Sequence, residues 1–266
     1  MRPQHLPDFN DPPLNELVVG VQFAAIPGYD LINAGEVHSL YRDRYPSVEL
    51  RAPQPPFFET FGAPATEAGV RFEMGMQTSH PRFWFISEDK HDLVQFETTR
   101  FMHNWRQIDG IGGKYPRYEA VMENFKTELA QLDGYSFQKS KFPLQITQAE
   151  ISYINRIYAT EAGSWPFEDL SFLSLPVTEV ELGGGYFQRV YETAHGLQGR
   201  LYTEFATNRD SFGNPFILFS QTFRGAPDAT NIESAIEFID AGRQIVVESF
   251  SKLTTERAHQ KWKRTK

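Results

Sequence analysis

The side chains most able to do chemistry lie in a hinge, where a strand-like segment runs into a glycine-rich loop. The segment LVQFETTRFMHNW ends at Trp105, and the loop IDGIGGK follows shortly after it. Functional residues are commonly carried on loops held by a rigid scaffold, so one interpretation is that this hinge lines the rim of a pocket. The side chains concerned are His103, Asn104, Trp105, Arg106, Tyr115 and Arg117. The alternative is that Trp105 anchors the loop in the core and Asn104 hydrogen-bonds its backbone.

Polar residues inside two predicted strands form a second candidate site. Two triplets each share one strand face: Gln95, Glu97 and Thr99, and Gln148, Glu150 and Ser152. On a solvated face of a sheet these are ordinary outward positions, whereas on a concave face they form a hydrogen-bonding floor for a ligand or partner. Glu97 and Glu150 could also act as a carboxylate pair in general acid–base catalysis, with His103 as a third group.

Sequence signatures of cofactor, metal and nucleophile sites are missing. The chain has no Walker loop, no G-x-S-x-G motif and no H-E-x-x-H motif, and the glycine run 183–185 lacks the lysine of a phosphate-binding loop. The seven histidines are dispersed without the spacing of metal ligands, and zero cysteines remove thiolate chemistry and Cys-rich zinc sites. We therefore expect no cofactor, no metal site and no catalytic residue.

Composition indicates a folded, acidic protein. Hydrophobic residues make up 40% of the 266 residues, and the formal net charge is -8. A protein that binds the phosphate backbone normally carries a basic face, so nucleic acid is disfavoured as the main partner. No apolar run is long enough for a transmembrane helix and the N-terminus lacks a signal-peptide core, so we expect a cytoplasmic protein without a membrane partner. The basic segment Lys252–Lys266 is either a solvated helix end or a partner-binding tail.

Apolar periodicity and turn residues predict an alternation of strands and helices. An arm over residues 1–15 precedes the first strand. Strands are predicted over residues 16–25, 70–76, 82–87, 93–101, 145–160, 186–193, 199–206 and 215–223. Helices are predicted after a cap at Asp30 or Asn33, from Pro116 to a break at Asp133–Gly134, around residues 167–173, and from a capping box at Thr230 and Glu233 onward. Residues 47–68 contain four prolines and are predicted to form an irregular connection.

The order of these elements predicts an α+β protein with an internal duplication. Residues 16–140 and 141–266 each follow a β-α-β-β-β-α order, and we expect them to pack as one globular unit. Two such units joined edge to edge give a curved antiparallel sheet with the two long helices on one face. This arrangement resembles the architecture of the TATA-binding protein. The helix-grip fold, in which a sheet wraps around a long C-terminal helix, is the rival.

Several segments together suggest a family. PPLNELVVGVQF, LVQFETTRFMHNW followed by YPRYE, and QAEISYINRI resemble a sporadically distributed family of uncharacterised bacterial and archaeal proteins of about this length. The resemblance covers most of residues 12–160, and in the C-terminal half only the final long helix agrees. It implies no catalytic activity. The scattered distribution of such proteins implies an association with mobile defence or toxin–antitoxin systems.

The leading hypothesis from the sequence is a non-enzymatic binding protein, antitoxin-like or defence-associated, whose partner is another protein encoded by a neighbouring gene. An acidic chain rich in aromatic residues suits recognition of a cationic protein. A homodimer is a further option. The alternative is a small-molecule or nucleotide-binding module that uses the concave sheet face. A carboxylate-dependent hydrolase using Glu97 or Glu150 with His103 is the least favoured hypothesis.

Overall fold

The computed structural model describes residues 6–55, 58–59, 61, 80–108, 113–161, 163–173, 183–193, 196 and 198–266. The strands are β1 (Leu14–Phe23), β2 (Ser47–Arg51), β3 (Arg82–Ile86), β4 (Asp92–Glu97), β5 (Arg100–Arg106), β6 (Ile146–Tyr158), β7 (Gly184–Glu192), β8 (Gln198–Arg209) and β9 (Pro215–Gly225). The helices are the 3-10 turns η1 (Leu31–Asn33) and η2 (Phe167–Asp169) and the α-helices α1 (Ala34–Ser39), α2 (Tyr118–Ser140), α3 (Ile232–Leu253) and α4 (Glu256–Lys261).

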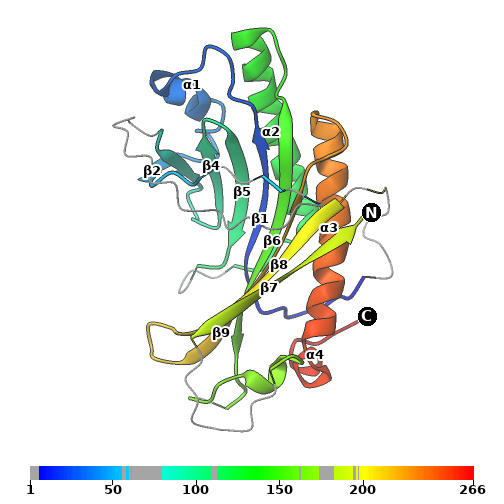
Figure 1. Cartoon of the computed structure of the whole chain (residues 1–266). Helices are drawn as coiled ribbons and strands as arrows, with labels where there is room; N and C mark the ends of the chain where they lie inside the picture. Colours follow the sequence, from blue (N-terminus) through cyan, green and yellow to red (C-terminus); the bar gives the residue numbers. More distant parts are fainter. Residues whose placement is uncertain are drawn as a thin grey trace.

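The described strands form one antiparallel sheet in the order β2-β3-β4-β5-β1-β6-β9-β8-β7 (Figure 1). The apolar run of β1 suits its place in the middle of the sheet, where it pairs with β5 on one side and with β6 on the other. One large antiparallel sheet with few helices confirms the expected α+β class. Among the described helices, none is both long enough and apolar enough to cross a membrane.

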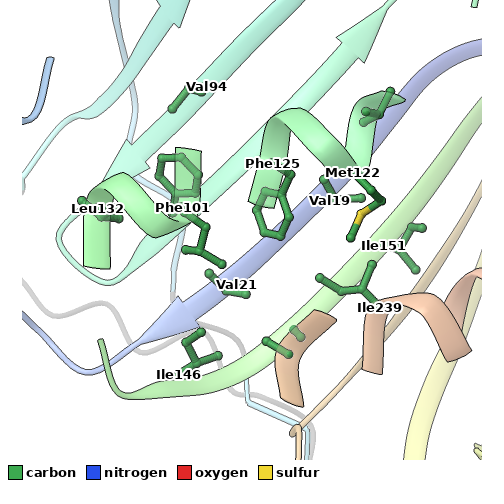
Figure 2. Packing of buried hydrophobic residues seen from close by; sticks show 14 of the residues in the cluster. Val19, Val21, Val94, Phe101, Met122, Phe125, Leu132, Ile146, Ile151 and Ile239 are labelled. Atoms are coloured by element: carbon green, nitrogen blue, oxygen red, sulfur yellow. The ribbon is translucent and has the colours of Figure 1, made fainter. Parts of the chain in front are cut away.

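The main core lies between the sheet and the two long helices. Helix α2 packs on β5, while α3 packs on β6 and β9. Figure 2 shows Val19 and Val21 of β1 and Phe101 of β5 near Phe125 of α2, with Ile239 of α3 beside them. These side chains are fully buried or nearly so, and burying one such side chain contributes about 1.5–3 kcal/mol. The opposite face of the sheet carries neither long helix and is called the helix-free face below.

The predicted ends of both long helices were wrong. Helix α2 does not break at Asp133–Gly134 but continues to Ser140, and Lys141 then ends it with a left-handed φ of 67°. Packing favours the longer helix, because the Ser136 hydroxyl donates to the Phe142 carbonyl at 3.0 Å. Helix α3 is capped by Asn231, whose side chain accepts from the Ser234 amide at 2.9 Å, rather than by the predicted capping box.

Two strand predictions were also wrong. The stretch 93–101 is not one strand but the hairpin β4–β5, and the turn at Thr98–Thr99 was missed because it contains no Gly, Pro, Asn or Asp. The proline-rich connection begins with an edge strand, β2, which pairs with β3. The predicted strand 70–76 lies outside the described residues, and only η2 forms where a helix was expected around 167–173.

The N-terminal arm packs along the C-terminal end of the chain. The Thr265 amide donates to the Asp8 carbonyl at 2.8 Å, and the Asn10 amide donates to the Lys263 carbonyl at 3.1 Å. The Phe9 ring meets the Trp262 ring edge-on at 6.0 Å. The two ends of the chain therefore stabilise each other, and the arm forms one wall of a pocket described below.

Candidate functional site

His103 lies inside the protein and not on a pocket rim. It belongs to β5 and points at α2, and none of its surface is exposed. Its Nδ1 lies 2.8 Å from Glu128 Oε2, and its Nε2 lies 3.5 Å from Asp92 Oδ1. The Tyr45 hydroxyl donates to the other oxygen of Glu128. Arg44 completes the cluster, 3.1 Å from Asp92 and 3.6 Å from Glu128.

The electrostatics of this histidine cluster favour a protonated His103. Burial disfavours the charged ring and lowers its pKa, but the carboxylates of Glu128 and Asp92 outweigh burial and raise the pKa to about 9. A histidine without solvent exposure cannot exchange a proton with a substrate directly. The cluster instead joins β4, β5 and α2 through buried charges.

Asn104 and Gln95 belong to a hydrogen-bonded relay across four strands of the helix-free face. The Asn104 amide donates to Glu16 Oε1 at 2.6 Å and accepts from the Gln95 amide at 2.8 Å. The Gln95 carbonyl oxygen in turn accepts from Trp84 Nε1 at 3.0 Å and from Arg82 at 3.1 Å. Burial raises the pKa of the Glu16 carboxyl, against the lowering effect of the Asn104 hydrogen bond. The relay engages the Asn104 and Gln95 side chains within the protein.

Trp105 and Arg106 end β5 on opposite faces of the sheet. Trp105 is buried, its ring 5.1 Å from that of Tyr115 and 6.4 Å from that of His91. The Arg106 guanidinium lies 5.6 Å from the centre of the Trp84 ring, and Arg51 lies 4.5 Å from the same ring. The hinge residues therefore divide between the core and the helix-free face, and do not form one rim.

The connection after β2 crosses the helix-free face. The Glu97 carboxylate accepts from the Gln54 amide at 3.0 Å, and Arg100 donates to the Gln54 side chain at 2.8 Å. Further along, Glu59 accepts from Arg200 at 2.9 Å and from the Tyr202 hydroxyl at 2.7 Å. Residues 52–55 and 58–59, called the crossing segment, thus cover part of the floor that the sequence offered for a ligand.

Glu97 and Glu150 are not a carboxylate pair. Glu97 lies on β4 and Glu150 on β6, and the sheet order places β5 and β1 between these strands. Three strand spacings separate the two backbones by about 14 Å. Glu150 accepts from Arg224, while Glu97 lies 3.6 Å from Arg100. Thr99, predicted on the same face as Glu97, lies in the turn instead.

Tyr115 and Arg117 line a pocket in the described part of the chain. It lies between the N-terminal arm, the start of α2, the middle of β6 and the C-terminal half of α3, and its volume is about 70 Å³. Arg117 has a left-handed φ of 79° and donates to Asp8 at 3.2 Å and to the Phe9 carbonyl at 3.0 Å, which fixes the arm. Strained backbone of this kind concentrates at functional sites.

Two polar residues of this pocket, Arg243 and Tyr153, are not among the site residues predicted from the sequence. Arg243 donates to Glu119 at 3.0 Å and lies 4.0 Å from the centre of the Tyr118 ring. Tyr153 lies on β6 and lines the same pocket. The sequence does contain an indication that Arg243 has a special role: this charged residue interrupts the apolar stripe of α3 at a position that faces the core.

Comparisons with known proteins leave the family open. No protein-family model matches the chain, and no curated protein matches it. Among solved structures the chain is similar to the di-domain ARO/CYC StfQ from the steffimycin biosynthetic pathway, at 10% identity over 91% of this chain and 99% of that chain. The TM-score of that similarity is 0.16, which is too low to support a conclusion about fold or function. The described residues contain no group of His, Asp or Glu side chains arranged to hold a metal ion.

Proposed function

We propose that the protein is a non-enzymatic binding protein whose partner is another protein chain. The candidate acid–base groups support binding over catalysis: His103 is fully buried, and Glu97 and Glu150 are each paired with an arginine. An antitoxin-like or defence-associated role, with the partner encoded by a neighbouring gene, belongs to the same proposal and rests on the family resemblance.

The observation that carries the proposal is the exposed edge strand β7. It ends the sheet, and within the described residues it pairs with β8 alone. All but one of its nine residues are exposed, including Tyr186 at 74%, Phe187 at 40% and Val190 at 43%. An open edge offers unpaired backbone N–H and C=O groups to an incoming strand, and aromatic side chains anchor interfaces. We infer that the partner adds a strand to β7.

The charge beside β7 favours a basic partner. A hollow between the end of β7 and α3 is lined by Glu192, Glu237, Asp240 and Glu248, and the whole chain carries a net charge of -8. Lysine or arginine side chains next to an added strand would meet these carboxylates, which raises the association rate and disfavours acidic competitors.

The finer architecture we propose is a duplicated unit like that of the TATA-binding protein. Support comes from the sheet order, in which β1-β5-β4-β3 on one side of the centre is mirrored by β6-β9-β8-β7 on the other. Two repeats joined at their first strands give this symmetry. The first half adds β2 beyond β3, and the described residues of the second half show no counterpart beyond β7. The proposed partner strand would occupy that place.

Co-purification with the products of neighbouring genes tests the proposal. We expect one of them to form a stable complex with the wild-type chain and to lose it with Val190→Pro, because proline removes a backbone donor from the edge. Val48→Pro, in the other edge strand β2, is the matched control and should keep the complex. The proposal is wrong if the chain purifies alone with every neighbour, or if folded Val190→Pro binds as well as wild type. A doubled mass without any neighbour would identify a homodimer instead.

A further inference from the structure

We propose that the pocket between the arm, α2 and α3 is a binding site for a small organic carboxylate with an apolar body. This site is independent of the edge strand β7 and of a protein partner. Its polar side is formed by Arg243, Tyr153, Tyr115, Asn155, the Arg117–Asp8 pair and the first turn of α2. Its apolar side is formed by Leu14, Val246, Val247 and Phe250.

The first observation is a buried guanidinium with an unused donor. Arg243 is only 7% exposed, and its single carboxylate contact within the described residues is Glu119. Its Nε is buried and has no hydrogen-bond partner among those residues. An unsatisfied buried donor on a charged group destabilises the protein, because it has lost its water partners without gaining an acceptor. An acceptor entering the pocket that Arg243 lines would remove this penalty.

The second observation is the uncapped start of α2 on the same pocket. The 23-residue helix begins at Tyr118, and its N-cap residue, Arg117, makes no side-chain capping hydrogen bond. The first amide groups of a helix have no partner within the helix, and the helix dipole places partial positive charge there. Such an end binds anions through its amides. The acidic residue of the first turn, Glu119, is already engaged by Arg243.

The third observation is a pair of neutral hydroxyls beside the guanidinium. Tyr153 and Tyr115 line the pocket together with Arg243. Burial raises the pKa of Tyr153, and burial together with Tyr153 raises the pKa of Tyr115, so both rings keep their protons at neutral pH. Neutral hydroxyls can donate to a carboxylate, whereas phenolates would repel it.

The size and the apolar walls of the pocket determine what the part of the ligand outside the carboxylate can be. A volume of about 70 Å³ is small, and the walls opposite the polar groups are aliphatic or aromatic. Sites of this kind orient a ligand with few polar groups and gain affinity from its apolar part. A compact ring or short chain that carries one carboxylate fits, while a phosphorylated or multiply charged ligand would have to place charge against Val246 and Phe250.

Calorimetry and thermal shift with matched carboxylate–amide pairs test the proposal. The probes are acetate, butyrate and benzoate against acetamide, butyramide and benzamide, at constant ionic strength. We expect at least one carboxylate to bind ten times or more tighter than its amide and to raise the melting temperature. Arg243→Met, which keeps most of the side-chain volume without charge, should abolish this preference. Arg42→Met, at an exposed position, should leave it unchanged.

A second variant tests the site in case the Arg243→Met variant does not fold. Val247→Phe fills the apolar wall and keeps Arg243, and it should weaken the carboxylate by the same factor or more. The site assignment is overturned if no carboxylate binds the wild-type chain, if amides bind as well as carboxylates, or if folded Val247→Phe keeps wild-type affinity. None of these results bears on binding at β7, so the two proposals fail separately.

Discussion

His103 Nδ1 of β5 lies 2.8 Å from Glu128 Oε2 of α2, in the interior between sheet and helix. This contact ties the long helix to the sheet, because separating the two side chains would leave a buried charge without its partner. Asp92 and Arg44 extend the pairing to the surface, where the Arg44 side chain is 42% exposed. The most chemically suggestive histidine in the sequence thus has a structural role in the described protein.

Replacing His103 by leucine should destabilise the protein strongly. The variant leaves the buried Glu128 and the partly buried Asp92 without the imidazolium, and breaking a buried pair in this way costs about 3–5 kcal/mol. Guanidinium chloride unfolding measures the loss. The double variant His103→Leu with Glu128→Leu is the control, since an apolar pair leaves fewer orphaned charges. It should be more stable than the single variant, and a strictly additive double variant would contradict this account.

Stability should fall with rising pH between about 6.5 and 9. His103 has an ordinary pKa of 6.5 and a folded-state pKa raised to about 9 by Glu128 and Asp92 against the lowering effect of burial. A raised pKa means that the folded state binds the proton more tightly. The stabilisation is therefore complete below pH 6.5 and is lost as the pH rises through 9. The difference between the two pKa values corresponds to a change on the order of 3 kcal/mol in the free energy of unfolding.

Denaturant unfolding at pH 6, 7.5 and 9 would detect this slope. The His103→Leu variant should lose most of the slope, because it has no proton to release at this position. Arg44 and Tyr45, which also face Glu128, remain unchanged in the variant and serve as the internal reference. An equal slope in both proteins would assign the pH dependence to other groups.

Removing Glu59 should loosen the crossing segment. Its carboxylate is 3% exposed and accepts from Arg200 and Tyr202, so Glu59→Ala leaves both donors without this partner. We expect the free energy of unfolding to fall by about 1–3 kcal/mol. Hydrogen exchange should also become faster at the backbone amides of residues 54 and 59. Glu49→Ala is the control, because the exposed Glu49–Arg51 pair contributes only about 0–1 kcal/mol. Unchanged exchange in Glu59→Ala would show that other contacts hold the segment.

Local patterns predicted most strands and the buried face of α2 correctly. Val121, Phe125 and Leu129 recur at helical spacing and are fully buried, as their period predicts. The candidate site was less predictable because its contacts join residues far apart in sequence. Tyr45 and Glu128 are 83 positions apart, and Arg117 and Asp8 are 109 apart. Periodicity carries no information about such pairs.

The predicted C-terminal end of α2 was wrong because it relied on a glycine as a helix breaker. The pair Asp133–Gly134 predicts a helix end, since glycine is a poor helix former. In the structure the helix passes through it, and the Asp133 carboxylate accepts from the Leu144 amide at 2.7 Å. Tertiary packing of Tyr135 and Ser136 outweighs a local cost of about 1 kcal/mol.

Gly134→Ala should therefore stabilise the protein by about 0.5–1 kcal/mol. An added Cβ at Gly134 meets nothing within 4 Å, so alanine can favour the helical backbone conformation without a steric clash. Gly28→Ala is the matched control: its surroundings are equally open, but its φ of 78° is left-handed and should make alanine destabilising. Thermal and denaturant unfolding of the two variants measures the contrast. A helix that ended at Asp133 would give no stabilisation at Gly134, and that result would restore the shorter helix predicted from the sequence.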